Sequence, residues 1–204
     1  MKEGKGIVRS IMIDRYDRHI DYLRVSVTDR CNLRCTYCMP KEGFSLIGHD
    51  DILRYEEILR IIRIAAGQGI TKVRITGGEP FVRRGVVEFI ASLRSVPELT
   101  DVSLTTNGTL LEAYAEGLYE AGIRRINISL DSLKADKYAR ITRGGDIEAV
   151  LRGIRKVRRI GFSPIKVNIV AIKGVNDDEI LDFARLTLDA PYQIRFIELM
   201  PLGR

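Results

Sequence analysis

Apolar residues recur along the chain with two periodicities, which alternate from one segment to the next. Runs that are apolar, or that alternate with polar residues, predict strands over residues 22–28, 72–76, 101–106, 125–130, 165–172 and 193–199. Helical spacing of apolar residues fills the intervals, over residues 54–67, 84–94, 110–121, 147–160 and 177–188 and within 134–141. The pattern predicts an α/β fold in which helices cover a parallel sheet.

Successive βα units curl a parallel sheet toward a barrel, because their crossovers are right-handed. Six units predict a partial (β/α)6 TIM-like barrel that stops after its sixth strand. The rival architecture is a doubly wound open sheet, which usually carries a G-x-G-x-x-G phosphate loop after its first strand. In this chain that position holds cysteines instead.

Length and composition are those of one ordinary globular domain spanning residues 1–204, with 45% hydrophobic and 29% charged residues. No apolar run is long enough to cross a bilayer, so we expect no membrane association and a cytoplasmic location. The net charge of +6 favours anionic partners. The basic run at 152–159 falls on one predicted helix, so we expect a solvated face there and no nucleic-acid partner.

All three cysteines, Cys31, Cys35 and Cys38, lie in one loop after the first predicted strand. An odd and clustered set of thiols is a poor disulfide framework and indicates metal binding. Iron–sulfur clusters are commonly held by four thiolates, so three would leave one iron of a [4Fe–4S] cluster open to a substrate. The alternative is a zinc site completed by His19 or His49.

Other chemically unusual residues also follow predicted strands, and in barrel-like folds that end of the sheet carries the site. After the second strand, Gly77 and Gly78 would let backbone approach a ligand closely, and Glu79 could lie near an ammonium group. The alternatives are structural: a turn at 77–80, another turn at 105–108, and a helix N-cap at 129–131.

Polar residues on the predicted strands suggest a second feature. Lys166 alternates with apolar neighbours, so it is predicted to point into the barrel, where a lysine needs an anionic partner. Arg24, Arg74 and Arg195 lie on other strands and could converge with Lys166 as an anion pocket suited to a triphosphate. The alternative is salt bridges to Asp or Glu on neighbouring strands.

The spacing C-x3-C-x2-C, with Tyr37 before the third cysteine and Gly-Gly-Glu one βα unit later, resembles the radical S-adenosylmethionine (SAM) superfamily. This resemblance implies a [4Fe–4S] cluster on the three cysteines and SAM as cofactor. It places Tyr37 beside the adenine of SAM, and the turn at Gly78 and Glu79 beside the amino group of SAM.

Residues 21–40, 73–81, 104–108, 124–131, 165–170 and 195–201 further resemble, in the same order, the GTP 3′,8-cyclase family of molybdenum cofactor biosynthesis. That resemblance implies a lyase in which a 5′-deoxyadenosyl radical starts the conversion of GTP to (8S)-3′,8-cyclo-7,8-dihydroguanosine 5′-triphosphate. The implied partners are GTP, an electron-donor protein and the downstream cyclic pyranopterin phosphate synthase pathway. The implied contacts are Tyr37, Gly78, Ser129 and Met200 for SAM, and Arg24, Arg74, Thr105 and Lys166 for GTP.

Members of that family continue into a C-terminal region with a second [4Fe–4S] cluster on three further cysteines, whereas this chain has three cysteines in all. We therefore expect an N-terminal core fragment that does not cyclise GTP alone. Two other functions stay open at this point. One is a different radical SAM enzyme, for example one that modifies a peptide, and the other is a non-catalytic zinc-binding module.

Overall fold

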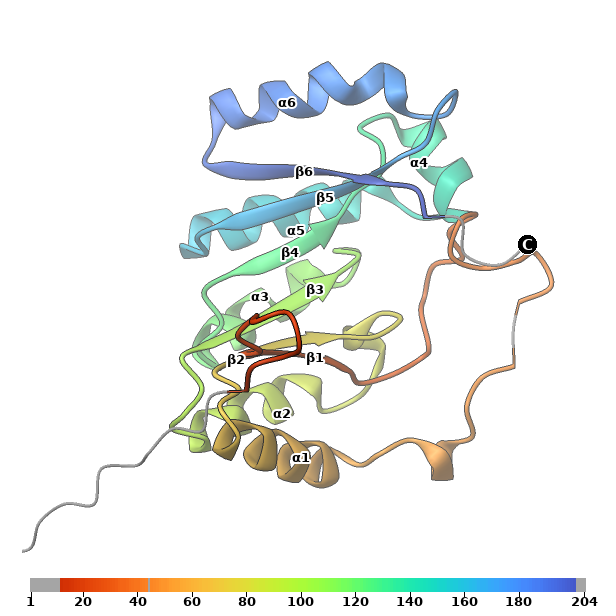
Figure 1. Cartoon of the computed structure of the whole chain (residues 1–204). Coiled ribbons are helices and arrows are strands. Elements are labelled where there is room, and N and C mark those ends of the chain that lie inside the picture. The colour runs from red at the N-terminus through yellow and green to blue at the C-terminus, as the bar shows by residue number, and fades with distance from the viewer. Residues whose placement is uncertain (1–11, 44, 201–204) are drawn as a thin grey trace, which may run out of the picture.

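The computed structural model describes residues 12–43 and 45–200. Its centre is one parallel sheet of six strands in the order β1-β2-β3-β4-β5-β6 (Figure 1). Each strand pairs with the next one in the chain, which confirms the predicted succession of βα units, and β1 and β6 lie at the two ends of the order. The strands are β1 (Tyr22–Ser26), β2 (Lys72–Thr76), β3 (Asp101–Thr106), β4 (Ile126–Ser129), β5 (Ile165–Ala171) and β6 (Tyr192–Glu198).

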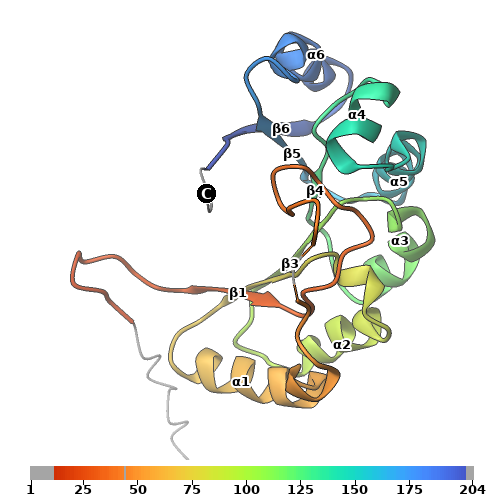
Figure 2. The same cartoon turned by 90° about the vertical axis from the view of Figure 1, so that its right-hand side faces the viewer.

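The helices lie on one side of this sheet. Figure 2 shows a curved wall with the helices along its convex side and the concave side open, which is the predicted partial barrel. The α-helices are α1 (Tyr55–Gly67), α2 (Val86–Ser92), α3 (Leu111–Glu120), α4 (Ala135–Thr142), α5 (Ile147–Ile160) and α6 (Ile180–Asp189). Short 3-10 turns are η1 (His49–Asp51), η2 (Pro80–Val82), η3 (Leu93–Ser95) and η4 (Asp177–Glu179). None of the described helices is long and apolar enough to span a membrane.

The two faces of the sheet differ because side chains alternate along each strand. In β2, Val73 and Ile75 are fully buried, whereas Arg74 between them is only half-buried. In β5, Val167 is buried and Lys166 is half-buried. The apolar set packs against the helices and forms the core, and the polar set faces the concave side.

Helix α5 shows how local sequence sets the limits of an element. The side chain of Asp146 accepts a hydrogen bond from the N–H of Glu148 at 2.9 Å, which caps the first turn. The helix ends at Gly161, whose φ of 104° is a left-handed conformation that glycine adopts without strain. Between these caps, Val150 and Val157 are fully buried beneath the sheet.

The basic residues of α5 lie on its outer side, as predicted. Arg152 pairs with Glu112 of α3 at 3.0 Å, and Lys156 pairs with Glu116 at 3.2 Å. Because α3 supplies these carboxylates, part of the basic charge is balanced at the surface.

Two helices, α2 and α6, start two or more residues later than the sequence predicts. The expected start of α2 at residue 84 moves to Val86, because Gly85 adopts a left-handed φ of 79°. The expected start of α6 at residue 177 moves to Ile180, because residues 177–179 form the 3-10 turn η4.

Candidate functional site

The cysteine loop begins just beyond the carboxyl end of β1 and folds as a tight turn. The backbone N–H groups of Cys38 and Met39 both donate to the carbonyl oxygen of Cys35, at 3.0 Å each. Leu33 and Met39 are 8% exposed and anchor the loop in the core. All three thiols are free, so none is taken up by a disulfide.

The loop is attached to the end of α4. The N–H of Arg34 donates to the carbonyl of Thr142 at 3.1 Å, and the N–H of Thr36 donates to that of Ile141 at 2.8 Å. These carbonyls have no partner inside the helix, so the cysteine loop serves as their cap. Arg143, which follows α4, donates to the carbonyl of Met39 at 2.9 Å and so adds a further attachment.

The surroundings of the thiols oppose their ionisation. Burial, followed by the charges of Cys38 and Asp131, raises the pKa of Cys35 to about 12. The pKa of Cys38 is also raised, first by burial and then by Asp131. Among the described residues, no cationic side chain stabilises either thiolate, and a bound metal would supply the positive charge. Three thiols of this kind in one turn fit an iron–sulfur cluster, whose irons provide that charge.

The arrangement fits a single zinc ion less well. Among the described residues, no three Cys, His, Asp or Glu side chains converge as one metal ion requires. His19 bridges Ile13 in a hairpin that precedes β1, at the opposite end of the strand from the cysteines. His19 is therefore misplaced as a fourth ligand, and the side chain of His49 lies outside the described part.

The Gly-Gly turn after β2 packs against the backbone that leads into the cysteine loop. The N–H of Gly78 donates to the carbonyl of Thr28 at 2.7 Å, and the N–H of Glu79 donates to that of Arg30 at 2.8 Å. A Cβ on Gly78 would lie 2.3 Å from the carbonyl oxygen of Arg30, and a Cβ on Gly77 would lie 2.6 Å from that of Thr28. Both positions thus require glycine, because the backbone of this turn packs directly against the backbone that leads into the cysteine loop.

Glu79 lies in a network of hydrogen bonds within the protein. Its side chain is fully buried, and its carboxylate accepts hydrogen bonds from the Thr106 hydroxyl at 2.9 Å and the Asn107 N–H at 2.7 Å. The N–H of Phe81 donates a third bond at 3.1 Å. Burial raises the pKa of Glu79, and these bonds oppose that rise. Glu79 therefore ties the end of β2 to the end of β3.

Asn107 continues this connection to the cysteines, and the sequence analysis did not assign it a role beyond a turn. Its side-chain amide donates to the sulfur of Cys31 at 3.7 Å and to the side-chain oxygen of Asn32 at 2.9 Å. Asn32 in turn donates to Thr109 at 2.8 Å. The only sequence signal was the position of Asn107 directly after a strand.

Tyr37 points toward β4. Its hydroxyl donates to Oδ2 of Asp131 at 2.6 Å, and the N–H of Val170 donates to Oδ1 at 2.8 Å. Burial, and after it the charge of Asp131, raises the pKa of Tyr37. The alternative of a helix N-cap at 129–131 is wrong, because α4 begins four residues later, with Lys134 at its N-cap. Asp131 was missed as a site residue for that reason.

The remaining residues predicted to contact SAM lie at the same edge. Ser129 is the last residue of β4, half-buried, and pairs in register with Asn168 of β5. Met200 follows the end of β6 and is 62% exposed. The structure thus brings Tyr37, Gly78, Ser129 and Met200 to the carboxyl ends of four different strands.

The predicted cations gather on the concave face. Arg24 and Arg74 are partners in the β1–β2 register, and Thr105 lies on the same face of β3, in register with Asn127. Burial lowers the pKa of Lys166, and the nearby charges of Arg195, Arg125 and Arg74 lower it further. Burial also lowers the pKa of Arg74, and repulsion by the nearby arginines lowers it further.

The alternative of salt bridges is wrong for the four predicted cations. None of the ion pairs among the described residues includes Arg24, Arg74, Lys166 or Arg195. Arg125 is a fifth member that the sequence analysis missed, and it does pair with a carboxylate, that of Asp101. Among the described residues, four of the five cations on the concave face therefore have no ion-pair partner, and Arg125 is paired with Asp101.

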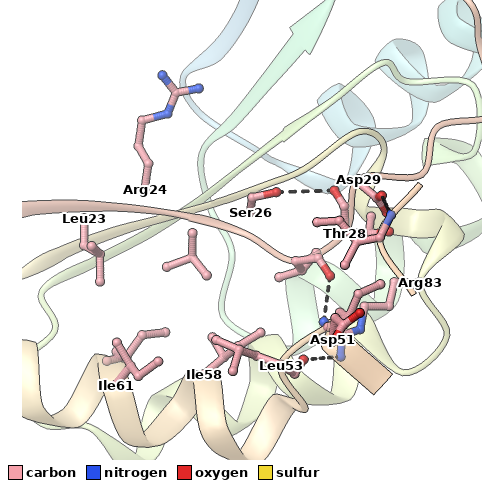
Figure 3. A pocket seen from close by; sticks show the side chains of 15 residues that line it. Leu23, Arg24, Ser26, Thr28, Asp29, Asp51, Leu53, Ile58, Ile61 and Arg83 are labelled. Atoms are coloured by element: carbon pink, nitrogen blue, oxygen red, sulfur yellow. Dashed lines mark hydrogen bonds between the residues drawn. The ribbon is translucent and has the colours of Figure 1, made fainter. Parts of the chain in front are cut away.

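A hollow of about 410 Å³ lies on the other side of β1. Figure 3 shows its apolar lining, with Leu23 of β1 facing Ile58 and Ile61 of α1, while Arg24 points away from it. Arg83 closes one end by donating to the carbonyls of Val27 at 2.6 Å and Leu53 at 2.7 Å. This hollow is separate from the concave face that carries the cations.

Fold and site together define a class of protein: a helix-covered partial barrel with three thiols on the loop after its first strand. The family model of the radical SAM superfamily matches residues 25–187, and the chain belongs to that superfamily.

Among curated relatives the chain is similar to proteins named GTP 3′,8-cyclase. It is 56% identical to the one from Alkaliphilus oremlandii, over 94% of this chain and 60% of that protein. Identity to the one from Moorella thermoacetica is also 56%, over 94% of this chain and 59% of that protein. The chain therefore spans about 60% of the length of these relatives.

Solved structures show the same fold at low identity. SuiB of Streptococcus suis, bound to S-adenosylmethionine, matches with a TM-score of 0.70 and 18% identity, over 90% of this chain and 40% of that one. Methylornithine synthase matches with a TM-score of 0.69 and 17% identity, over 88% and 53%. These likenesses confirm the architecture of a partial TIM-like barrel.

Proposed function

We propose that this chain is the cluster- and SAM-binding barrel, as one domain over residues 1–204, of a GTP 3′,8-cyclase of molybdenum cofactor biosynthesis. One observation carries the proposal. Arg24, Arg74, Lys166 and Arg195, which form no ion pair within the described part of the chain, lie on the concave face, and the three cysteines lie on a loop at the rim of that same face. The relatives at 56% identity support GTP as the anionic substrate.

The rim residues would hold the cofactors. Cys31, Cys35 and Cys38 would ligate a [4Fe–4S] cluster through their thiolates. When bound, the cluster and SAM supply a one-electron cleavage that yields a hydrogen-abstracting radical. Tyr37, whose ring is held in place by Asp131, would lie along the adenine. The backbone of Gly78 and the side chains of Ser129 and Met200 would complete the SAM site.

The cations would hold the triphosphate of GTP. Arg24, Arg74 and Arg195 offer planar forks that match phosphate oxygens, and Lys166 offers a point charge. These groups repel one another in the free protein, so an anion that neutralises them gains affinity from the relief of that repulsion. With the phosphates held at mid-strand, the ribose and base would extend toward the rim, beside Thr105.

The activity of a whole GTP 3′,8-cyclase is a further step, because the relatives are longer than this chain. We expect the 204 residues alone to bind GTP but not to release the cyclised product. Turnover would also need an electron-donor protein, and the product would pass to the synthase that forms cyclic pyranopterin phosphate.

Anaerobic reconstitution with iron and sulfide tests the proposal. The chain should bind about four irons and four sulfides, and the triple Cys→Ala variant at residues 31, 35 and 38 should bind none. GTP should raise the melting temperature of the reconstituted chain more than ATP or a basic peptide does. A colourless, zinc-loaded protein would favour the metal-binding module instead. A cluster without any response to GTP would favour a radical SAM enzyme with another substrate.

A further inference from the structure

Asp131 is a buried carboxylate that has no cationic partner among the described residues. Its side chain is 3% exposed, and its two oxygens accept one hydrogen bond each, from the Tyr37 hydroxyl and the Val170 N–H. The contrast is Glu179, which is also fully buried but forms an ion pair with Lys137 at 2.9 Å. The negative charge of Glu179 is balanced, and that of Asp131 is not.

The bonding pattern favours the ionised form of Asp131. Burial raises the pKa of Asp131, but the bonds that its two oxygens accept from the Tyr37 hydroxyl and the Val170 N–H oppose that rise and stabilise the carboxylate. Burial keeps water and salt away from this charge, so it acts over a longer range than a surface charge would.

The charge lies next to the cysteine loop. Tyr37, whose hydroxyl donates to the carboxylate, stands between Cys35 and Cys38 in the chain. The hydrogen bond between Asp131 and Tyr37 holds the buried carboxylate against the loop that carries the two sulfurs. A group bound by these sulfurs would be exposed to the field of Asp131.

We propose that Asp131 is a positioning residue that fixes Tyr37 and whose fixed negative charge lowers the reduction potential of the cluster held by the cysteines. This inference rests on the proposed cluster site. Reduction adds an electron to the cluster, and a nearby unscreened negative charge disfavours that addition. The reduced cluster is then a stronger one-electron donor, and only the charge of Asp131, not its shape, produces the effect.

The experiment is a redox titration of the reconstituted full chain, followed by the electron paramagnetic resonance signal of the reduced cluster. Asp131→Asn keeps the shape and removes the charge. At a fixed solution potential it should raise the ratio of reduced to oxidised cluster by about tenfold, toward a more positive midpoint. Tyr37→Phe keeps the charge, and its ratio should stay within about threefold of wild type.

Two further variants complete the test. Asp178→Asn removes a carboxylate that is half exposed and paired with two lysines, and it should leave the midpoint unchanged. Asn168→Lys adds a positive charge on the strand beside Asp131, since the N–H of Leu130 bonds the carbonyl of Asn168 at 3.0 Å. Asn168→Lys should raise the ratio of reduced to oxidised cluster. If Asp131→Asn assembles no cluster, Asn168→Lys becomes the deciding variant.

The failures of the two proposals are distinct. Wild-type chain that takes up no iron or sulfide would refute the cluster site itself. If wild type forms the cluster and Asp131→Asn has the same midpoint potential as wild type, the role of Asp131 is overturned and the cluster site stands. The same holds for Asn168→Lys where that variant decides. A shift in Tyr37→Phe as large as that in Asp131→Asn would assign the effect to loop geometry and equally overturn the role of the charge.

Discussion

Thr36 donates its backbone N–H to the carbonyl oxygen of Ile141 at 2.8 Å, and this bond joins the cysteine loop to the last turn of α4. The neighbouring bond from Arg34 to Thr142 has the same character. A helix end needs donors, and a short loop needs something rigid to hold its shape. The two needs are met by one contact, so the arrangement of the cysteines depends on an element far along the chain.

Truncating Ile141 should therefore loosen the cluster as well as the fold. Ile141 is 2% exposed, and Ile141→Ala should lower the free energy of unfolding by about 2–5 kcal/mol through lost contacts and a cavity. Iron should leave the reconstituted variant several times faster than it leaves wild type. Chelator-trapped iron release and denaturant unfolding measure the two effects. Leu118→Ala, at a fully buried position of α3, is the matched control that should destabilise the fold with little change in iron release. Equal rates in the two variants would contradict the coupling.

Gly78 should not tolerate a side chain even in the absence of ligand. The Cβ of Gly78→Ala would lie 2.3 Å from the backbone oxygen of Arg30, which cannot move without shifting the start of the cysteine loop. We expect a loss of about 1–3 kcal/mol in the free energy of unfolding, together with reduced iron binding. Gly67→Ala, near the end of α1 with open space around it, should be neutral or slightly stabilising. Denaturant midpoints of the two variants compare them directly, and a fully stable Gly78→Ala protein would refute the packing argument.

Much of the fold and part of the site could be predicted from the sequence because they follow from alternation within strands. Arg74 and Lys166 stand between buried residues, so their direction follows from their neighbours alone. Asp131 could not be found that way, because its partners Tyr37 and Val170 come from distant segments that only the tertiary fold brings together. The partners of Glu79 were equally hidden: it stands directly after a strand in the sequence, and only the fold brings Thr106 and Asn107 within hydrogen-bond distance of its carboxylate.

Lys166 should contribute to GTP binding at a cost to the stability of the free protein. Its charge is repelled by Arg195, Arg125 and Arg74, so Lys166→Met should raise the melting temperature of the chain without nucleotide. The same change should weaken GTP binding by roughly tenfold to a hundredfold, the value of one charge-assisted contact. Calorimetric titration and thermal unfolding give the two numbers. Arg60→Met, at an exposed position of α1, is the control that should leave GTP affinity unchanged. Tighter or equal binding in Lys166→Met would show that the triphosphate lies elsewhere.

Asp178 should make the stability of the protein depend on pH in a narrow acidic window. Hydrogen bonds from Lys134 and Lys137 lower the pKa of Asp178 from 3.8 to about 2. A carboxyl whose pKa is lower in the folded state stabilises the fold above its unfolded pKa, and this contribution disappears as the pH falls through the folded pKa. Wild type should therefore exceed Asp178→Asn in stability at pH 7, and the difference should shrink between about pH 4 and pH 2. Lys134→Met removes the first of these donors, so it should narrow the pH range over which the stability contribution of Asp178 disappears. Denaturant unfolding at pH 7, 5, 4 and 3 measures the difference, and a gap that stays constant over this range would show that the lysines do not hold Asp178 in its charged form.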